Sequence, residues 1–209
     1  MTNLRDKKNI IFDLGNVVID INLNITFQRF KELGFTIKGD FWDMFRQSSF
    51  FKEFEEGTIS KEEFIAQILQ KMPKNVTYKQ VVDAWNALIL DYKPERIETI
   101  LKLRNTHKVY LLSNTNELHI EKCGDNVPLV GSLDKLFDKV YYSHTMKMSK
   151  PNENIFAALL SDAGIMASET LFLDDSPANV ATAEKLGIES WLVEYPDQWV
   201  PKMNALIEE

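Results

Sequence analysis

The stretch that most constrains the fold covers residues 9–20, where a carboxylate directly follows a short apolar run. Residues 10–12 are all apolar, which is typical of a strand buried on both faces of a parallel sheet. Asp13 follows, and a Gly-Asn pair then marks a backbone turn, because both residue types tolerate positive φ. The pattern predicts that Asp13 lies at the carboxyl end of a buried strand, where α/β sheets bind ligands. Taken alone, the stretch is equally consistent with an aspartate that caps a turn.

Strands and helices alternate again from Pro94 to the end of the chain. Helix-starting residues stand at Pro94, at Ser149–Pro151 and at Ser176–Pro177. Alternation of this kind predicts the α/β class, with a doubly wound parallel sheet. The further predicted strands are the short apolar runs at residues 109–112, 140–142, 171–173 and 191–193.

The segment between the first strand and Pro94 has a different character. Aromatic and aliphatic residues recur at helical spacing, no strong strand pattern appears, and capping boxes stand at Ser60–Glu63 and Thr77–Gln80. We therefore expect an all-helical insertion of about four helices. Helically spaced aromatic residues usually form the core of a helical layer, although some could line a pocket. Those considered for a pocket are Trp42, Phe45, Phe50 and Phe51.

Polar side chains stand where the predicted strands end or the next helix begins. A parallel sheet brings such positions to one edge. They are Asp13, Ser113–Asn114, Lys150 and Asp174–Asp175. Oxygen ligands from Asp13 and Asp175 suit Mg²⁺, which usually takes one or two carboxylates and leaves room for a substrate phosphate. Ser113 and Lys150 can then hold phosphate oxygens, and Asp13 can act as a nucleophile.

Each of these groups also has an ordinary structural explanation. Ser113 could cap a helix, and Lys150 could be a solvated surface lysine. The pair Asp174–Asp175 could be an acidic turn before a helix N-terminus. All four groups in this order, each beside a predicted buried strand, are far more specific than any one of them.

Four segments together resemble the motifs of the haloacid dehalogenase (HAD) superfamily, and the resemblance covers nearly the whole chain. The segments are residues 12–17, 112–115, 149–151 with Ile155–Phe156, and 172–176 with Asn179. The first two motifs and residues 54–60 also look like a bacterial subgroup that includes an α-D-glucose-1-phosphate phosphatase. The likeness implies a Rossmann-like core of residues 1–20 and 93–209. A small helical cap domain, residues 21–92, would be inserted after the first strand.

The resemblance implies that Asp13 is a nucleophile that forms an aspartyl-phosphate intermediate. It also implies that Asp13, the carbonyl of Gly15 and Asp175 bind Mg²⁺, with Asp174 beside them. The sequence departs from the family pattern at Gly15, where most phosphatases of the superfamily carry a second aspartate as general acid and base. The subgroup shares this glycine, yet the proton-transfer role is vacant. Asp20 is the nearest other carboxylate in the sequence, although capping the entry to the insertion is its more ordinary role.

The residues that the resemblance assigns to the substrate phosphate are Ser113, Asn114 and Lys150, and Lys150 is also counted as catalytic. His119 and His144 have no ligand-like spacing to another histidine or cysteine, so we predict that neither binds zinc. His144 lies shortly before Lys150 and could approach the site, but a structural role is preferred.

Composition limits the partners of the chain. A formal net charge of −7 over 209 residues, without a Lys/Arg cluster, makes nucleic acid and anionic membranes poor partners. No apolar run is long enough to cross a membrane, and residues 1–8 lack a signal-peptide pattern. The single cysteine, Cys123, cannot form an intrachain disulfide, which fits a reducing compartment. We therefore predict a cytoplasmic protein whose partner is a small phosphorylated metabolite.

The sequence thus predicts a Mg²⁺-dependent hydrolase that removes phosphate from a small phosphomonoester, such as a sugar phosphate. Two alternatives stay open. A 2-haloacid dehalogenase-like hydrolase would use the same aspartate without a metal, which fits the acidic pair poorly. A phosphate-binding regulatory protein with little turnover would follow if Gly15 has removed the proton-transfer step. The sequence leaves open the substrate, the general acid or base, the specificity residues and the oligomeric state.

Overall fold

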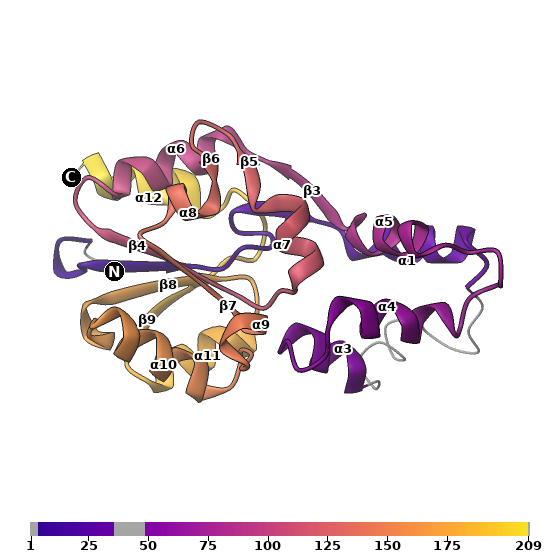
Figure 1. Cartoon of the computed structure of the whole chain (residues 1–209). Helices are drawn as coiled ribbons and strands as arrows, with labels where there is room; N and C mark the ends of the chain where they lie inside the picture. Colours follow the sequence, from indigo (N-terminus) through magenta and orange to yellow (C-terminus); the bar gives the residue numbers. More distant parts are fainter. Residues whose placement is uncertain (1–3, 36–48, 209) are drawn as a thin grey trace.

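A five-stranded parallel sheet forms the centre of the computed structural model, which describes residues 4–35 and 49–208. The spatial order is β7-β4-β1-β8-β9 (Figure 1). The bounds of the strands are β1 Asn9–Phe12, β4 Lys108–Ser113, β7 Lys139–Tyr142, β8 Thr170–Asp174 and β9 Glu189–Leu192. All five strands predicted from the apolar runs are present, so the predicted doubly wound α/β fold is confirmed.

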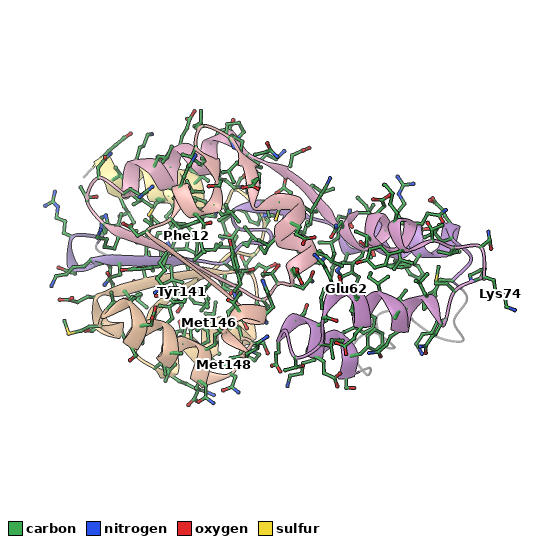
Figure 2. All side chains as sticks on the ribbon, in the orientation of Figure 1. Phe12, Glu62, Lys74, Tyr141, Met146 and Met148 are labelled. Carbon is green, nitrogen blue, oxygen red and sulfur yellow. The ribbon has the colours of Figure 1, made fainter. Side chains whose placement is uncertain are left out.

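Helices cover both faces of the sheet (Figure 1). One face carries α6 (Pro94–Leu103), α8 (Leu133–Leu136) and α12 (Trp199–Glu208), and the other carries α10 (Glu153–Ala163) and α11 (Pro177–Lys185). Side chains of a strand point alternately to the two faces. Phe12 therefore packs in the core below α6 and α12, whereas Tyr141 packs on the opposite side with α10 (Figure 2).

A layer of helices follows β2 (Ile19–Ile21) and lies beyond the carboxyl ends of the strands of the sheet (Figure 1). Its described helices are α1 (Leu23–Glu32), α3 (Ser49–Glu55), α4 (Lys61–Leu69) and α5 (Tyr78–Asn86). Both predicted capping boxes are present, at the starts of α4 and α5. The helices enclose an aromatic core that includes Phe50, Phe51, Phe54, Phe64 and Trp85. Phe50 and Phe51 are thus core residues of the layer, while Trp42 and Phe45 lie outside the described residues.

The prediction that the insertion is entirely helical is wrong at its end. β3 (Ile89–Tyr92) pairs antiparallel with β2 (Ile19–Ile21), and the two strands form the stem through which the chain enters and leaves the helical layer. Such short strands have little local pattern, because their pairing joins segments about 70 residues apart and only tertiary contact stabilises it. Asp20 lies in β2 and does not cap α1, whose N-cap is Asn22.

Helix α7 (Glu117–Cys123) joins the helical layer to the sheet. Its Leu118 packs in the aromatic core of the layer, and His119 stacks on Trp85 with ring centroids 5.1 Å apart. Lys61 of α4 pairs with Glu117 at 3.0 Å. The remaining elements are β5 (Asp125–Val127), β6 (Gly131–Ser132), α9 (Ser143–Met146) and 3₁₀ turns at Leu4–Asp6 and Ala167–Glu169. None of the helices in the described part of the chain is both long and apolar enough to span a lipid bilayer.

The aromatic core of the helical layer generates a stability prediction. Phe64 is fully buried and stacks on Phe54 with centroids 4.1 Å apart. Phe64→Ala should lower the free energy of unfolding by about 3–5 kcal/mol, because it removes this contact area and leaves a cavity. Urea unfolding of the variant measures the loss. The half-exposed Tyr78 provides a control, since Tyr78→Ala should change stability by less than about 1 kcal/mol. Equal effects of the two substitutions would contradict the assignment.

Candidate active site

Asp13 lies where the central strand ends. β1 stops at Phe12, and the backbone N–H of Asp13 still donates to the carbonyl of Leu173 at 2.9 Å, which extends the ladder with β8. Asp174 is the last residue of β8, and Asp175 follows it. The buried β1 backbone thus sets Asp13 directly beside the acidic pair.

The residues predicted from the strand ends come together. All of them except Asp174 line one cavity of about 310 Å³, namely Asp13, Ser113, Asn114, Lys150 and Asp175. Gly15 belongs to the same lining, whereas Asp174 is fully buried and contacts Lys150. The convergence of segments more than 130 residues apart follows from the parallel sheet, because every strand presents its carboxyl end at the same edge.

Lys150 is buried at the bottom of this site, with 1% of its side chain exposed. Its Nζ donates to Asp13 Oδ1 at 2.8 Å, to Asp174 Oδ2 at 2.7 Å and to the carbonyl of Leu112 at 2.8 Å. Burial by itself lowers the pKa of this ammonium, but the two carboxylates outweigh burial and raise the pKa. Lys150 is therefore a charged internal residue, and the alternative of a solvated surface lysine is excluded.

The negative charge of the three carboxylates at the site exceeds the positive charge of the one lysine beside them. Oxygens of Asp13, Asp174 and Asp175 lie within 4.8 Å of one another. Burial raises the pKa of Asp13, and the neighbouring Asp174 raises it further, while Lys150 opposes both effects. The pKa of Asp175 is raised too, mainly by burial. One ammonium against three carboxylates favours a further cation, and hard oxygen ligands suit a divalent ion such as Mg²⁺.

Asp174 is less available to a metal than its neighbours. Its Oδ1 accepts hydrogen bonds from the backbone N–H of Ser176 at 2.8 Å and from Asn179 Nδ2 at 2.9 Å. Its Oδ2 accepts from Lys150 and, at 3.1 Å, again from Asn179. These partners satisfy both oxygens, which leaves Asp13 and Asp175 as the carboxylates better suited to a cation.

Asn16 is a site residue that the sequence reasoning missed. It follows Gly15 at a positive φ of 56°, and its Nδ2 donates to Asp175 Oδ2 at 3.0 Å. Its Oδ1 accepts from the backbone N–H of Ile21 in β2 at 3.3 Å. The Gly-Asn pair indicates a turn in the sequence. No local pattern indicates that the asparagine side chain also orients Asp175, about 160 residues away.

The phosphate-binding candidates after β4 have different surroundings. Asn114 Oδ1 accepts from the backbone N–H of Lys150 at 2.8 Å, and its Nδ2 donates to the Lys150 carbonyl at 2.8 Å. This pair of bonds explains why α10 begins at Glu153, after the predicted start near Ser149, since the Lys150 backbone is held outside the helix. Ser113 does not cap α7, whose N-cap is Asn116, so its hydroxyl stays at the cavity.

Gly15 has no side chain at the position where most phosphatases of the superfamily carry the second aspartate. Its φ is not positive, so the backbone conformation would accept other residues. The neighbouring side chain opposes them, because an added Cβ would lie 2.9 Å from Ile21 Cδ1. The other candidates for a proton-transfer role are engaged elsewhere. Asp20 Oδ1 accepts from the buried Arg96 at 2.7 Å. His144 stacks on Tyr142, with its Nδ1 3.3 Å from the carbonyl of Thr115.

Comparison with known proteins identifies the class. A family model described as haloacid dehalogenase-like hydrolase matches residues 7–187. The chain therefore belongs to the haloacid dehalogenase-like hydrolase family, as the four motifs predicted.

Individual relatives align with nearly the whole chain. It is 32% identical over 96% of its length to a D-ribitol-5-phosphate phosphatase from Bacteroides thetaiotaomicron, of which it spans 98%. A HAD-like hydrolase structure from Porphyromonas gingivalis is 38% identical, with a TM-score of 0.87 and coverage of 97% and 98% of the two chains. A Bacteroides thetaiotaomicron HAD enzyme in complex with magnesium and inorganic phosphate is 36% identical, with a TM-score of 0.85 and coverage of 92% and 97%. The narrower likeness to a glucose-1-phosphate phosphatase subgroup is not confirmed by these relatives.

The two acids of the pair should respond differently to substitution. Asp175→Asn should weaken Mg²⁺ binding more than Asp174→Asn, because both oxygens of Asp174 accept hydrogen bonds from other residues, whereas Asp175 accepts a side-chain hydrogen bond at Oδ2 alone among the described residues. Asp174→Asn should instead cost about 3 kcal/mol or more of unfolding free energy, since it breaks a buried ion pair. Calorimetric titration with Mg²⁺ and urea unfolding measure the two effects. The reverse order in either measurement would contradict the assignment.

Proposed function

We propose that this chain is a Mg²⁺-dependent phosphatase that hydrolyses a small phosphomonoester through an aspartyl-phosphate intermediate on Asp13. The observation that carries the proposal is the shared cavity of Asp13, Lys150 and Asp175, in which a nucleophile, a fixed cation and a metal-suited carboxylate pair meet. The D-ribitol-5-phosphate phosphatase relative and the neighbour with bound magnesium and phosphate support it.

The residues of the site divide the chemistry between them. Lys150 holds Asp13 Oδ1, so that the other carboxylate oxygen is the one presented to the substrate phosphorus. As the bond from Asp13 to phosphorus forms, the ester bond breaks, and the departing oxygen keeps the electron pair and takes a proton from solvent. Water then attacks the phosphorus and gives up a proton to solvent, and the bond from phosphorus to Asp13 breaks, which releases inorganic phosphate and regenerates the carboxylate. Mg²⁺ bound by Asp13, Asp175 and the Gly15 carbonyl supplies positive charge that balances the phosphate.

The helical layer has the place expected of a substrate-selecting cap. We assign residues 21–92 to this cap and residues 1–20 and 93–209 to the catalytic core, with β2 and β3 as the stem between them. The layer lies over the carboxyl ends of the strands, so the part of the substrate beyond the phosphate extends toward it (Figure 1). A polyol or sugar phosphate is the proposed substrate class, since the phosphatase relative acts on D-ribitol 5-phosphate. The partner is thus a small phosphorylated metabolite in the cytoplasm.

The two alternatives have less support in the site. A haloacid dehalogenase uses its aspartate without a metal, whereas this cavity concentrates three carboxylates. A binding protein without turnover does not need a nucleophile with one oxygen held by a buried lysine.

Removal of the nucleophile is the direct test. Asp13→Asn should abolish Mg²⁺-dependent phosphate release from p-nitrophenyl phosphate and from D-ribitol 5-phosphate, because the neutral amide cannot form the acyl phosphate. Chelation by EDTA should abolish the activity of the unaltered protein, and added Mg²⁺ should restore it. Urea unfolding serves as the control for folding. Near-native rates in the folded variant would disprove the mechanism.

The vacancy at Gly15 generates a second kinetic prediction. A positioned general acid typically supplies about 10²–10⁴-fold in rate, mostly for poor leaving groups. We expect kcat/KM to depend steeply on leaving-group pKa across small phosphomonoesters without hydroxyl groups, from aryl to alkyl esters. Gly15→Asp should flatten this dependence if Ile21 moves aside for the new side chain. A shallow dependence in the unaltered protein would show that another group donates the proton.

A further inference from the structure

The segment Glu55–Gly57 connects the helical layer to the two loops that carry Ser113 and Lys150. It includes the end of α3, which lies beside α9 (Figure 1). The carbonyl of Glu55 accepts from Ser143 Oγ at 2.6 Å, and the same hydroxyl accepts from the backbone N–H of Thr115 at 2.9 Å. Thr115 stands two residues after Ser113, so this buried serine joins the helical layer to the loop that follows β4.

The second contact of the segment reaches the loop of the catalytic lysine. Glu56 Oε1 accepts from Ser149 Oγ at 2.6 Å, directly before Lys150 in the chain. Lys147 Nζ donates to the carbonyl of Gly57. Gly57 has a φ of 61°, and an added Cβ would overlap the carbonyl oxygen of His144, so only glycine allows this close approach. Through these contacts, the segment Glu55–Gly57 docks the helical layer onto the loops beside the cavity.

Glu55 contributes to this docking only through its backbone carbonyl among the contacts of the described residues. Its side chain is half-buried, and its carboxylate has neither a hydrogen bond nor an ion pair from the described residues. The neighbouring Glu56, in contrast, is satisfied by Ser149. Burial raises the pKa of Glu55 to about 7, and the charge of Glu56 raises it further. A partly buried carboxylate that these residues leave without a partner is available to a ligand, and carboxyl groups with a raised pKa are typical of functional sites.

We propose that Glu55 is a specificity-determining residue whose carboxylate accepts hydrogen bonds from hydroxyl groups of the substrate. The inference rests on the proposed phosphatase function and deepens it. With the phosphate at Asp13 and the sheet beneath it, the remainder of the substrate extends toward the helical layer. Glu55 is the last residue of α3 and belongs to the segment whose contacts with Ser143 and Ser149 reach the loops of Ser113 and Lys150. Binding of the distant hydroxyl groups can be used to stabilise the transition state, which offsets a missing general acid at Gly15.

The test compares two esters of equal carbon number, D-ribitol 5-phosphate and n-pentyl phosphate. Glu55→Gln should lower kcat/KM for D-ribitol 5-phosphate by about 10–100-fold, the value of one hydrogen bond to a charged group. The same change should leave kcat/KM for n-pentyl phosphate within about threefold, since this ester has no hydroxyl to bind. Glu62→Gln is the matched control on the exposed surface of α4 and should change neither value (Figure 2).

Two further measurements separate the possible failures. Urea unfolding should find Glu55→Gln and Glu55→Ala at least as stable as the unaltered protein, because the half-buried carboxylate makes no hydrogen bond or ion pair with the described residues that either substitution would break. A loss of stability, an equal loss of kcat/KM on both esters, or no preference of the unaltered protein for the polyol would overturn the role of Glu55. Hydrolysis of p-nitrophenyl phosphate with Mg²⁺ reports the phosphatase function separately, so its absence would overturn that function instead.

Discussion

The buried ammonium of Lys150 is the interaction on which the rest of the site depends. It joins Asp13, 137 positions away in the chain, to Asp174 and to the backbone end of β4. Three strand ends are thereby connected through one cation. Isolated carboxylates at this depth would be strongly penalised by desolvation, and the lysine offsets that cost for two of them. Its own position is set by Asn114, whose side chain bonds to both backbone groups of the lysine.

The incomplete charge balance of the site favours a bound cation. One ammonium cannot neutralise Asp13, Asp174 and Asp175, so a divalent ion is favoured at their oxygens. In a chain with a net charge of −7, a phosphate would require such a local positive charge. Asn16 connects this arrangement to the stem, because one end of its amide contacts Asp175 and the other contacts β2.

The helical layer contacts the core in two distinct ways. Around α7 the contact is apolar, with Leu118 inside the aromatic core and His119 stacked on Trp85. Burial lowers the pKa of His119 to about 4, so the ring is neutral and acts as a packing group near neutral pH. At α9 the contact is polar and belongs to the segment Glu55–Gly57. The apolar contact fixes the layer over the sheet, whereas the polar contact aligns it with the loops that carry Ser113 and Lys150.

The sequence by itself determined the strands of the core and which polar residues meet at one edge of the sheet. Apolar runs that end in Asp13, Ser113 or Asp174 are local patterns, and a parallel sheet leaves only one edge at which their ends can meet. The aromatic spacing likewise determined that Phe50 and Phe51 form a helical core. These predictions succeeded because burial and strand direction follow from short stretches of residues.

Tertiary structure alone decided what each polar side chain does at that edge. The pairing of β2 with β3, the use of Asp20 by Arg96 and the contact of Asn16 with Asp175 all join residues that are distant in sequence. So does the docking of Glu56 on Ser149. Hydrogen bonds depend on distances of about 3 Å and on direction. No pattern of spacing along one chain encodes them, so they become visible only when the sheet has brought its loops together.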